Sequence, residues 1–468
     1  MMDEVTEQLA HFVAGLDKAA IPAEVRARAC RLMLDCIANI IRARHDSEST
    51  PAMLAMVRAA GLDHGHAALF GDSAHYAPAG AVLLGGMLAH SLDFDDTHAA
   101  AIVHAAAPIV PAALGAAGLV GASGAETLVG IIAGYEACLR IALALPPGAH
   151  YERGFHPSAT CGAFGAAAAA ARVLGLDAEA TASTFGIVLS QASGSLQFLA
   201  NGAWTKRFQV GWASMAGFIA ATLGREGFKG AAAPLEGRLG FLRAYAPAPD
   251  PQRVVQGLGE VWELMLTGVK PYPSCRWGHA GIDAALSLRA EYGWKPEEIE
   301  SVTLGLCRAG MLLIGEPEEK KRNPANIVDA QFSAPFVIAT ALATGAMDWD
   351  SYQGLADPQI RALMQRVRCE NDPEIEAEFP TNMAGKLTVV ARGQTYVKKL
   401  LVPKGGPGNF LTDEELRAKF DSLAAAVIGP ERAEKLAAMT LGFERLNQAA
   451  EIFAAARPLA ATKESLRG

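Results

Sequence analysis

Helical periodicity built on very small residues runs through most of the first 260 residues of this chain. The densest stretch starts at Cys161 and reads Cys-Gly-Ala-Phe-Gly followed by six alanines. Helices with small residues on every face can lie close to several neighbours at once, so they belong in the interior of a helical bundle. The apolar spacing predicts helices over residues 24–41, 81–96, 126–145, 160–174, 178–193 and 209–225.

The spacing of apolar residues changes from helical to alternating after Gly268. Residues 299–306 and 366–369 read as short strands, and residues 386–391 and 395–402 flank Arg392-Gly393-Gln394 as a hairpin. Helical patterns separate these strands, at residues 280–292, 329–344 and 357–364. Beyond the loop 404–409 the helical pattern returns, where Thr412 and Glu415 form a capping box.

These patterns predict a mainly α fold, with a large all-helical domain and an inserted, smaller α+β lid domain. We expect residues 1–267 and 405–468 to form the helical domain and residues 268–404 to form the lid. A chain of 468 residues is too long for one ordinary core, which agrees with two or three domains. The junction of two domains is a preferred place for a small-molecule site.

Charge and composition exclude several classes of protein. The net charge is -8, the sequence pI is about 5.8, and acids and bases are scattered, so nucleic acid and anionic membranes are poor partners. The acidic N-terminal residues show no secretory signal, which favours a cytoplasmic enzyme. Residues 99–125 carry no Lys, Arg, Asp or Glu, but their prolines and glycines favour a buried pair of helices over a membrane span.

One segment concentrates groups that can transfer protons. Residues 90–104 contain three aspartates and three histidines between stretches of Ala, Val, Leu and Gly. Burying carboxylates beside apolar runs is costly unless each charge has a partner, so this density indicates a site. If the segment is helical, Asp93, Asp96 and Thr97 share one face, whereas Asp95 points elsewhere as a helix-end or solvent charge. The alternative is an acidic helix terminus without chemistry.

Three further candidates lie outside that segment. His156 precedes the alanine-rich helix, where amide donors favour an anion, although it could equally be a simple cap. Lys206 also precedes a small-residue helix, and the alternative is that it and its neighbour Arg207 are ordinary surface cations. Arg276 and His279 follow two prolines that stiffen their loop; a Cys275–His279 nucleophile pair is a minor option.

Several cofactor motifs are missing from the sequence. The seven cysteines contain no CxxC pair, and the chain has no phosphate-binding loop, nucleophile elbow or dinucleotide-binding glycine motif after a strand. Residues 93–96 are similar to the aspartate-rich metal motif of helical prenyl-diphosphate enzymes. The spacing is wrong for two carboxylates at i and i+4, and no second such motif appears. That metal-dependent class and a non-catalytic carboxylate sensor remain the rivals.

Taken in order, these motifs resemble the MmgE/PrpD family, which includes 2-methylcitrate dehydratases, cis-aconitate decarboxylases and iminodisuccinate epimerases. The resemblance runs from about residue 8 to about residue 425. It rests on the following stretches: Asp-Phe-Asp-Asp-Thr-His from Asp93, then His104, Gly-Phe-His-Pro from Gly154, Thr205-Lys206, Lys-Pro-Tyr-Pro from Lys270 with His279, and Ala-Gln-Phe-Ser from Ala330.

The resemblance implies a homodimer that uses no metal or organic cofactor and acts on a small polycarboxylate. It places catalytic residues at Asp93, His104, His156 and Lys206, and it places Thr97 and His279 in the same site. Arg276 would join His279 in binding a distal carboxylate. Dehydration, decarboxylation and epimerisation share one enediolate intermediate, and we expect a hydro-lyase first. The segment after Thr97 differs from the dehydratase branch, and Phe336 replaces a tyrosine of several relatives, so the substrate stays open.

Overall fold

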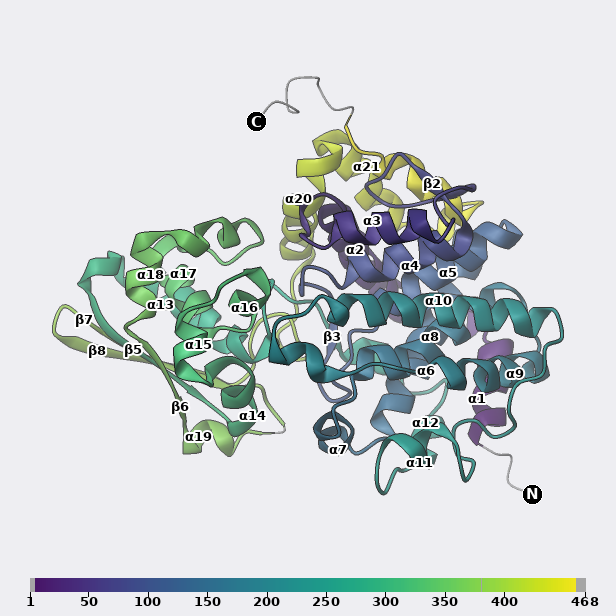
Figure 1. Ribbon diagram of the computed structural model, residues 1–468, viewed down its shortest axis with the longest axis horizontal. Coiled ribbons are helices and arrows are strands. Elements are labelled where there is room, and N and C mark those ends of the chain that lie inside the picture. The colour runs from purple at the N-terminus through teal and green to yellow at the C-terminus, as the bar shows by residue number, and fades with distance from the viewer. Residues whose placement is uncertain (1–4, 380, 460–468) are drawn as a thin grey trace. The chain divides into compact units, whose positions relative to one another are not determined.

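The computed structural model describes residues 5–379 and 381–459, which group into two compact units (Figure 1). The first unit runs to Thr267 and resumes at Thr412, and the second unit is Gly268–Leu411. The fold is mainly α, as the sequence predicts, and its four-stranded sheet belongs to the second unit.

Helix α8 (Pro157–Val173) is the centre of the first unit, and all its residues except Arg172 are buried. It packs against α5 (Ala106–Val120), α6 (Gly124–Leu143), α9 (Ala178–Val188) and α10 (Thr205–Arg225). Small side chains permit this crowding: a Cβ atom on Gly217 of α10 would lie 2.4 Å from the backbone nitrogen of Ala167. The interior position predicted for the alanine-rich helix is therefore confirmed.

Helices from both ends of the chain meet in the first unit. Helix α2 (Ala23–Asp46) packs against α20 (Asp413–Ile428), and Arg31 forms an ion pair with Asp413 at 2.6 Å. Helix α20 begins at the predicted capping box, in which Thr412 and Glu415 each accept the other's backbone N–H. Closure of the first unit thus depends on contacts between residues almost 400 positions apart in the sequence.

The apolar stretch 99–125 contains one complete helix, α5, rather than the expected pair. Residues 99–105 form a loop instead, and the next helix, α6, begins only at Gly124. Pro108 lies in the first turn of α5, and Pro111 lies inside the helix. Of the helices within residues 5–379 and 381–459, none combines the length and apolar character that a bilayer crossing requires.

The remaining regular elements of the first unit are shorter or lie at its edge. They are α1 (Val5–Gly15), α3 (Thr50–Ala59), α4 (Pro78–Ala89), α7 (Pro147–Glu152), α11 (Phe241–Tyr245), α12 (Gln252–Val255), α21 (Pro430–Leu441) and the two-residue strands β1 (Ala67–Ala68), β2 (His75–Tyr76) and β3 (Thr97–His98). Strand β4 (Thr267–Gly268) lies at the boundary of the two units.

The sheet of the second unit has the order β6-β5-β7-β8. Its strands are β5 (Ile299–Leu306), β6 (Val367–Asn371), β7 (Gly385–Ala391) and β8 (Gln394–Leu400). Strands β5 and β6 are parallel, and the other pairs are antiparallel. Burial alternates along β7, with Leu387 and Val389 fully buried, which is the pattern of a sheet with one covered face. The predicted strands and hairpin are confirmed.

Helices cover this sheet. Helix α13 (His279–Tyr292) packs on β7 and β8, and α17 (Ala334–Thr344) packs on β6. The helix predicted over residues 329–344 is split, because Ser333 caps α17 and ends the short α16 (Ile327–Gln331). Helix α18 (Pro358–Met364) agrees with the predicted helix at 357–364.

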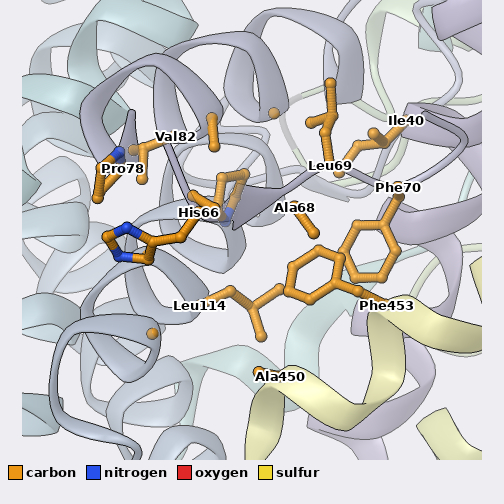
Figure 2. A pocket seen from close by; sticks show the side chains of 16 residues that line it. Ile40, His66, Ala68, Leu69, Phe70, Pro78, Val82, Leu114, Ala450 and Phe453 are labelled. Carbon is orange, nitrogen blue, oxygen red and sulfur yellow. The ribbon is translucent and has the colours of Figure 1, made fainter. Parts of the chain in front are cut away.

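An apolar pocket of about 230 Å³ lies in the first unit (Figure 2). It is lined by α4, α5 and η10 (Ala449–Ala456), and by residues around β1. Among the described residues that line it, His66 is the one titratable side chain. Acid–base chemistry therefore has to be sought elsewhere, in the polar segment that follows α4.

Candidate active site

The polar segment is a loop rather than a helix. Helix α4 ends at Ala89, not at residue 96 as predicted, and α5 begins at Ala106. Asp93 and Ile102 adopt left-handed backbone conformations, with φ of 51° and 54°. Such a conformation costs about 1–2 kcal/mol per non-glycine residue, so other contacts must hold the loop in place. The predicted helix face shared by Asp93 and Thr97 is therefore wrong.

Asp93 forms an ion pair with Lys206, from the first turn of α10. The Lys206 side chain is 12% exposed and that of Asp93 is 5% exposed, so the pair is mostly shielded from water. The next residue, Arg207, is buried and donates to the hydroxyls of Ser47 and Ser49 at 3.0 Å. The alternative that Lys206 and Arg207 are ordinary surface cations is therefore wrong.

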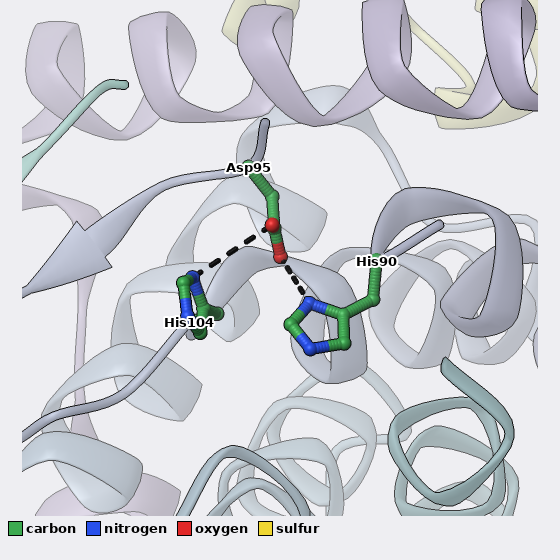
Figure 3. Close-up of side chains that lie close together, drawn as sticks. All are labelled: His90, Asp95 and His104. Carbon is green, nitrogen blue, oxygen red and sulfur yellow. Dashed lines mark hydrogen bonds and ion pairs between the residues drawn. The ribbon is translucent and has the colours of Figure 1, made fainter. Parts of the chain in front are cut away.

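His90, Asp95 and His104 lie together inside the first unit (Figure 3). His90 Nδ1 donates to one oxygen of Asp95 at 2.6 Å, and both side chains are fully buried. The other Asp95 oxygen lies 3.7 Å from His104 Nδ1. Asp95 is thus neither a helix-end nor a solvent charge, which corrects the prediction made for it. His90 is a residue that the sequence argument did not single out.

The hydrogen bonds of His104 fix its tautomer. Its Nδ1 lies 2.7 Å from the backbone oxygen of Asp96, and the Thr97 hydroxyl lies 3.2 Å from the same nitrogen. A carbonyl oxygen only accepts, so Nδ1 carries the proton, and the lone pair of the neutral ring is on Nε2. The side chain is 15% exposed, and this ring can therefore exchange protons with a molecule outside the core.

His156 approaches the same place from a different helix. It is the N-cap residue of α8, directly before Pro157. Its ring centre lies 5.5 Å from that of His90, which in turn lies 5.0 Å from that of His104. Burial, and then the charges of His90 and Lys206, hold the pKa of His156 well below its usual range. A neutral His156 is therefore expected at physiological pH.

Buried acidic side chains and their hydrogen bonds hold the loop between α4 and α5 in place. Asp96 accepts from the Tyr135 hydroxyl at 2.7 Å and from the backbone N–H of Ala106. Burial, together with the neighbouring Asp95 charge, raises the pKa of Asp96 to about 8. The carboxyl group of Asp96 is therefore neutral at pH 7, which lessens the repulsion between adjacent acids.

Lys419 connects this loop to the C-terminal helix α20. Its ammonium group forms an ion pair with Asp35 at 2.5 Å, donates to the backbone oxygen of Phe94 at 2.6 Å and lies 3.8 Å from the Phe94 ring centre. Burial raises the pKa of Asp35 to about 6 despite Lys419. No sequence pattern predicts this contact, because Lys419 lies 325 positions from Phe94.

His98 does not join the cluster. Its Nδ1 accepts from the backbone N–H of Ala101 at 3.1 Å, and its Nε2 lies 3.8 Å from a carboxylate oxygen of Glu263. Burial lowers the pKa of His98 to about 4. These contacts make it a neutral residue that shapes the loop.

His90, Asp95 and His104 also meet the distance criterion for a metal site, since one donor atom of each lies within 4.8 Å of the others. The hydrogen bonds restrict which ring nitrogens could act as ligands. His104 Nδ1 needs its proton for the Asp96 carbonyl, and His90 Nδ1 donates its own to Asp95. Both Nδ1 atoms carry protons and have no lone pair for a cation, so these histidines could hold an ion only through their Nε2 atoms.

The second unit contains the other two predicted residues. The Arg276 guanidinium donates to the backbone oxygens of Lys404 and Pro403 at 2.5 and 3.1 Å, and it lies 2.9 Å from His279 Nδ1. His279 is fully buried. Arg276 therefore bridges the start and the end of the second unit. Convergence of His279 with His104, His156 and Lys206 stays a prediction.

Comparison with known proteins agrees with this architecture. Residues 7–254 match the MmgE/PrpD N-terminal domain, and residues 272–445 match the MmgE/PrpD C-terminal domain. The chain therefore belongs to the MmgE/PrpD family, as the motifs indicated.

Three of the relatives are named as cis-aconitate decarboxylases or as similar to them. A cis-aconitate decarboxylase-like protein of Aspergillus oryzae is 28% identical, over 96% of each chain. The cis-aconitate decarboxylase of Aspergillus terreus is 24% identical over 94% of each chain. The cis-aconitate decarboxylase of Mus musculus is 26% identical, over 77% of this chain and 74% of its own.

Proposed function

We propose that this protein is a cofactor-independent lyase that acts on a small di- or tricarboxylic acid, and that decarboxylation is its first candidate reaction. The decarboxylase relatives support this order, in place of the hydro-lyase that was expected first from the family resemblance. The observation that carries the proposal is the cluster itself: His104 and His156 lie beside buried His90, and the charges of the Lys206–Asp93 pair act on His156.

The chemistry requires a stabilised carbanion beside a carboxylate. When the carbon–carbon bond to a carboxylate breaks, CO₂ leaves and its bonding electrons remain on the substrate as an enediolate. Lys206 offers positive charge for that anion, and amide donors at the N-termini of α8 and α10 add to it. For this reaction His104 must start as the imidazolium, with Nε2 protonated from solvent; it passes that proton to the enediolate carbon, which completes the product and leaves the neutral ring.

Dehydration would use the same groups in the opposite order. Neutral His104 would remove the α-proton through Nε2, and the enediolate would expel the hydroxyl group, which leaves as water once protonated. The single proton-exchanging imidazole thus serves either reaction, and the product identifies which one occurs. This hydro-lyase reaction, which was expected first from the family resemblance, is the second candidate.

We further propose that the protein is a homodimer, as the family resemblance implies, and that the second unit moves as a lid. Hydrogen exchange tests the lid: Gly268–Leu411 should open with a free energy below that of global unfolding. If the amide hydrogens of this unit exchanged only together with those in the core of the first unit, the lid proposal would be wrong.

The function is tested with a panel of di- and tricarboxylic acids followed by NMR in D₂O. Decarboxylation gives CO₂ and a deuterated product, dehydration gives an alkene and water, and epimerisation gives deuterium exchange at a stereocentre. Activity should survive EDTA, because the proposal needs no metal. Loss of activity on EDTA treatment, with recovery on adding a divalent cation, would support the metal-dependent rival instead.

A binding protein without chemistry would give a different result from the same panel. It would bind an acid, visible by calorimetry, and would exchange no substrate proton with D₂O. The proton-exchanging imidazole of His104 would then have no use, so this outcome would overturn the proposal.

A further inference from the structure

Gln209 lies one turn beyond Lys206 on α10 and holds the His156 ring. Its side-chain amide makes two contacts with one residue: its oxygen accepts from the backbone N–H of Ser195 at 2.8 Å, and its nitrogen donates to the backbone oxygen of Ser195 at 3.1 Å. A backbone N–H only donates and a carbonyl only accepts. The two contacts therefore fix which end of the amide is nitrogen.

The second amide hydrogen of Gln209 points to His156. The amide nitrogen lies 2.8 Å from His156 Nδ1, and an amide nitrogen has no lone pair to accept with. His156 Nδ1 must therefore be the acceptor. In the neutral ring the proton is then on Nε2, the opposite of the arrangement in His104, where Nδ1 donates to a carbonyl.

We propose that Gln209 is a positioning residue that keeps His156 as the Nε2–H tautomer, so that His156 donates a hydrogen bond to the bound acid while His104 alone exchanges a proton. The inference rests on the proposed function for its catalytic meaning. The tautomer itself rests only on the hydrogen bonds of Gln209.

The charges that face His156 favour its neutral form. His90 and Lys206 oppose a positive charge on it, as does His150 to a smaller extent, and Asp93 favours one. Burial outweighs Asp93, and the pKa of His156 stays well below its usual range. A neutral imidazole that donates from Nε2 stabilises a developing enediolate without titrating near pH 7.

Replacing Gln209 by Glu should reverse the direction of the hydrogen bond between residue 209 and His156 Nδ1. A carboxylate only accepts, so Gln209→Glu should draw the proton to His156 Nδ1 and leave Nε2 without one. Gln209→Met has a similar length and no donor, and it should leave both tautomers populated. The matched control is Gln197→Glu, which adds the same charge at an exposed glutamine of η3 (Leu196–Ala200).

The tautomer is read by ¹⁵N NMR of histidine-labelled full-length protein, with the His156 signals assigned through His156→Gln. We expect Nε2–H in the wild type and in Gln197→Glu, and Nδ1–H in Gln209→Glu. On the substrate found by the panel, Gln209→Glu should lose about 10²–10³-fold in kcat with a much smaller change in KM, as when one oxyanion donor is removed.

An Nδ1–H wild-type ring would overturn the proposal whatever the variants do. Wild-type kcat in a Gln209→Glu protein whose tautomer has switched would also overturn it, and would leave the proposed function intact. Because the tautomer readout needs no substrate, an inactive wild-type protein with the expected Nε2–H ring would overturn the proposed function alone. A folding defect in Gln209→Glu leaves the wild-type spectrum and Gln209→Met as the deciding measurements.

Discussion

Two segments of this chain each hold a pair of left-handed residues, and they do so for different reasons. In the hairpin of the second unit these are Arg392 and Gly393, with φ of 51° and 70°. A two-residue turn between twisted antiparallel strands demands this conformation, and Gly393 adopts it without a steric cost. In the loop between α4 and α5 they are Asp93 and Ile102; Ile102 closes the turn between the paired residues His98 and Val103, whereas Asp93 forms an ion pair with the distant Lys206.

The difference lies in what stabilises each segment. The hairpin is specified locally, by its turn and by the alternating strands on either side. The loop between α4 and α5 is held by residues distant in the sequence. Lys206 forms an ion pair with Asp93, and Lys419 donates a hydrogen bond to the backbone oxygen of Phe94. A strained loop kept in one shape by buried charges is a common feature of functional sites. Substitutions in the loop should therefore alter function, and those in the hairpin only stability.

The largest expected effect is on the proton-exchanging ring. His104→Gln keeps size and polarity but removes proton transfer, so kcat should fall by about 10²–10⁴-fold while the substrate still binds. His64→Gln is the matched control, because the His64 side chain is 86% exposed. Exchange of the substrate α-proton into D₂O at the wild-type rate in His104→Gln would move the base to another group of the cluster.

The next effect tests the distant partners of the loop. Lys419→Met leaves Asp35 buried without its cation, which should lower the free energy of unfolding by about 3–5 kcal/mol. The loss should be smaller at pH 5 than at pH 8, because Asp35 can take up a proton when the pH is low. Urea denaturation at both pH values measures this. Lys435→Met, at an exposed lysine of α21, should change stability little, and an equal loss in both variants would contradict the argument.

The same contrast explains how much the sequence could predict. Strand β5 occupies residues 299–306 as predicted, because alternation and turn chemistry are local. The loop after α4 was predicted as a helix, because its apolar spacing continues past Ala89 while the contacts that unwind it come from elsewhere.

The site itself was predictable only in part. His104, His156 and Lys206 were predicted because each stands beside a small-residue helix. Asp95 was misassigned, because only the tertiary position of His90 shows that its charge is buried and paired. Gln209 carried no signal at all, since its role depends on the backbone of Ser195.

The buried carboxyl group of Asp96 should make the free energy of unfolding depend on pH, an effect of intermediate size. The pKa of Asp96 is about 8 in the folded protein against a usual 3.8, so the folded state binds more protons between these values. Its contribution to stability is complete below about pH 4 and is lost as the pH rises towards 8. Asp96→Asn, which mimics the protonated acid, should flatten the fall in stability from pH 5 to pH 8. If the slope of unfolding free energy against pH were the same in Asp96→Asn as in the wild type, Asp96 would not titrate between pH 5 and pH 8.

The smallest expected effect returns to the hairpin. Gly393 has open space around it, so Gly393→Ala meets no clash, and its cost comes from the left-handed backbone alone. That cost should be about 1–2 kcal/mol in urea denaturation, with no change in kcat.

Gly15, at the end of α1, is the matched glycine, because it also has open space but has no positive φ. Gly15→Ala should be neutral or stabilising by up to about 1 kcal/mol. A loss of kcat in Gly393→Ala would break the comparison, since the hairpin would then act on the site as the loop after α4 does. Equal stability changes in the two variants would show that the turn tolerates a side chain, and that left-handed backbone carries no cost there.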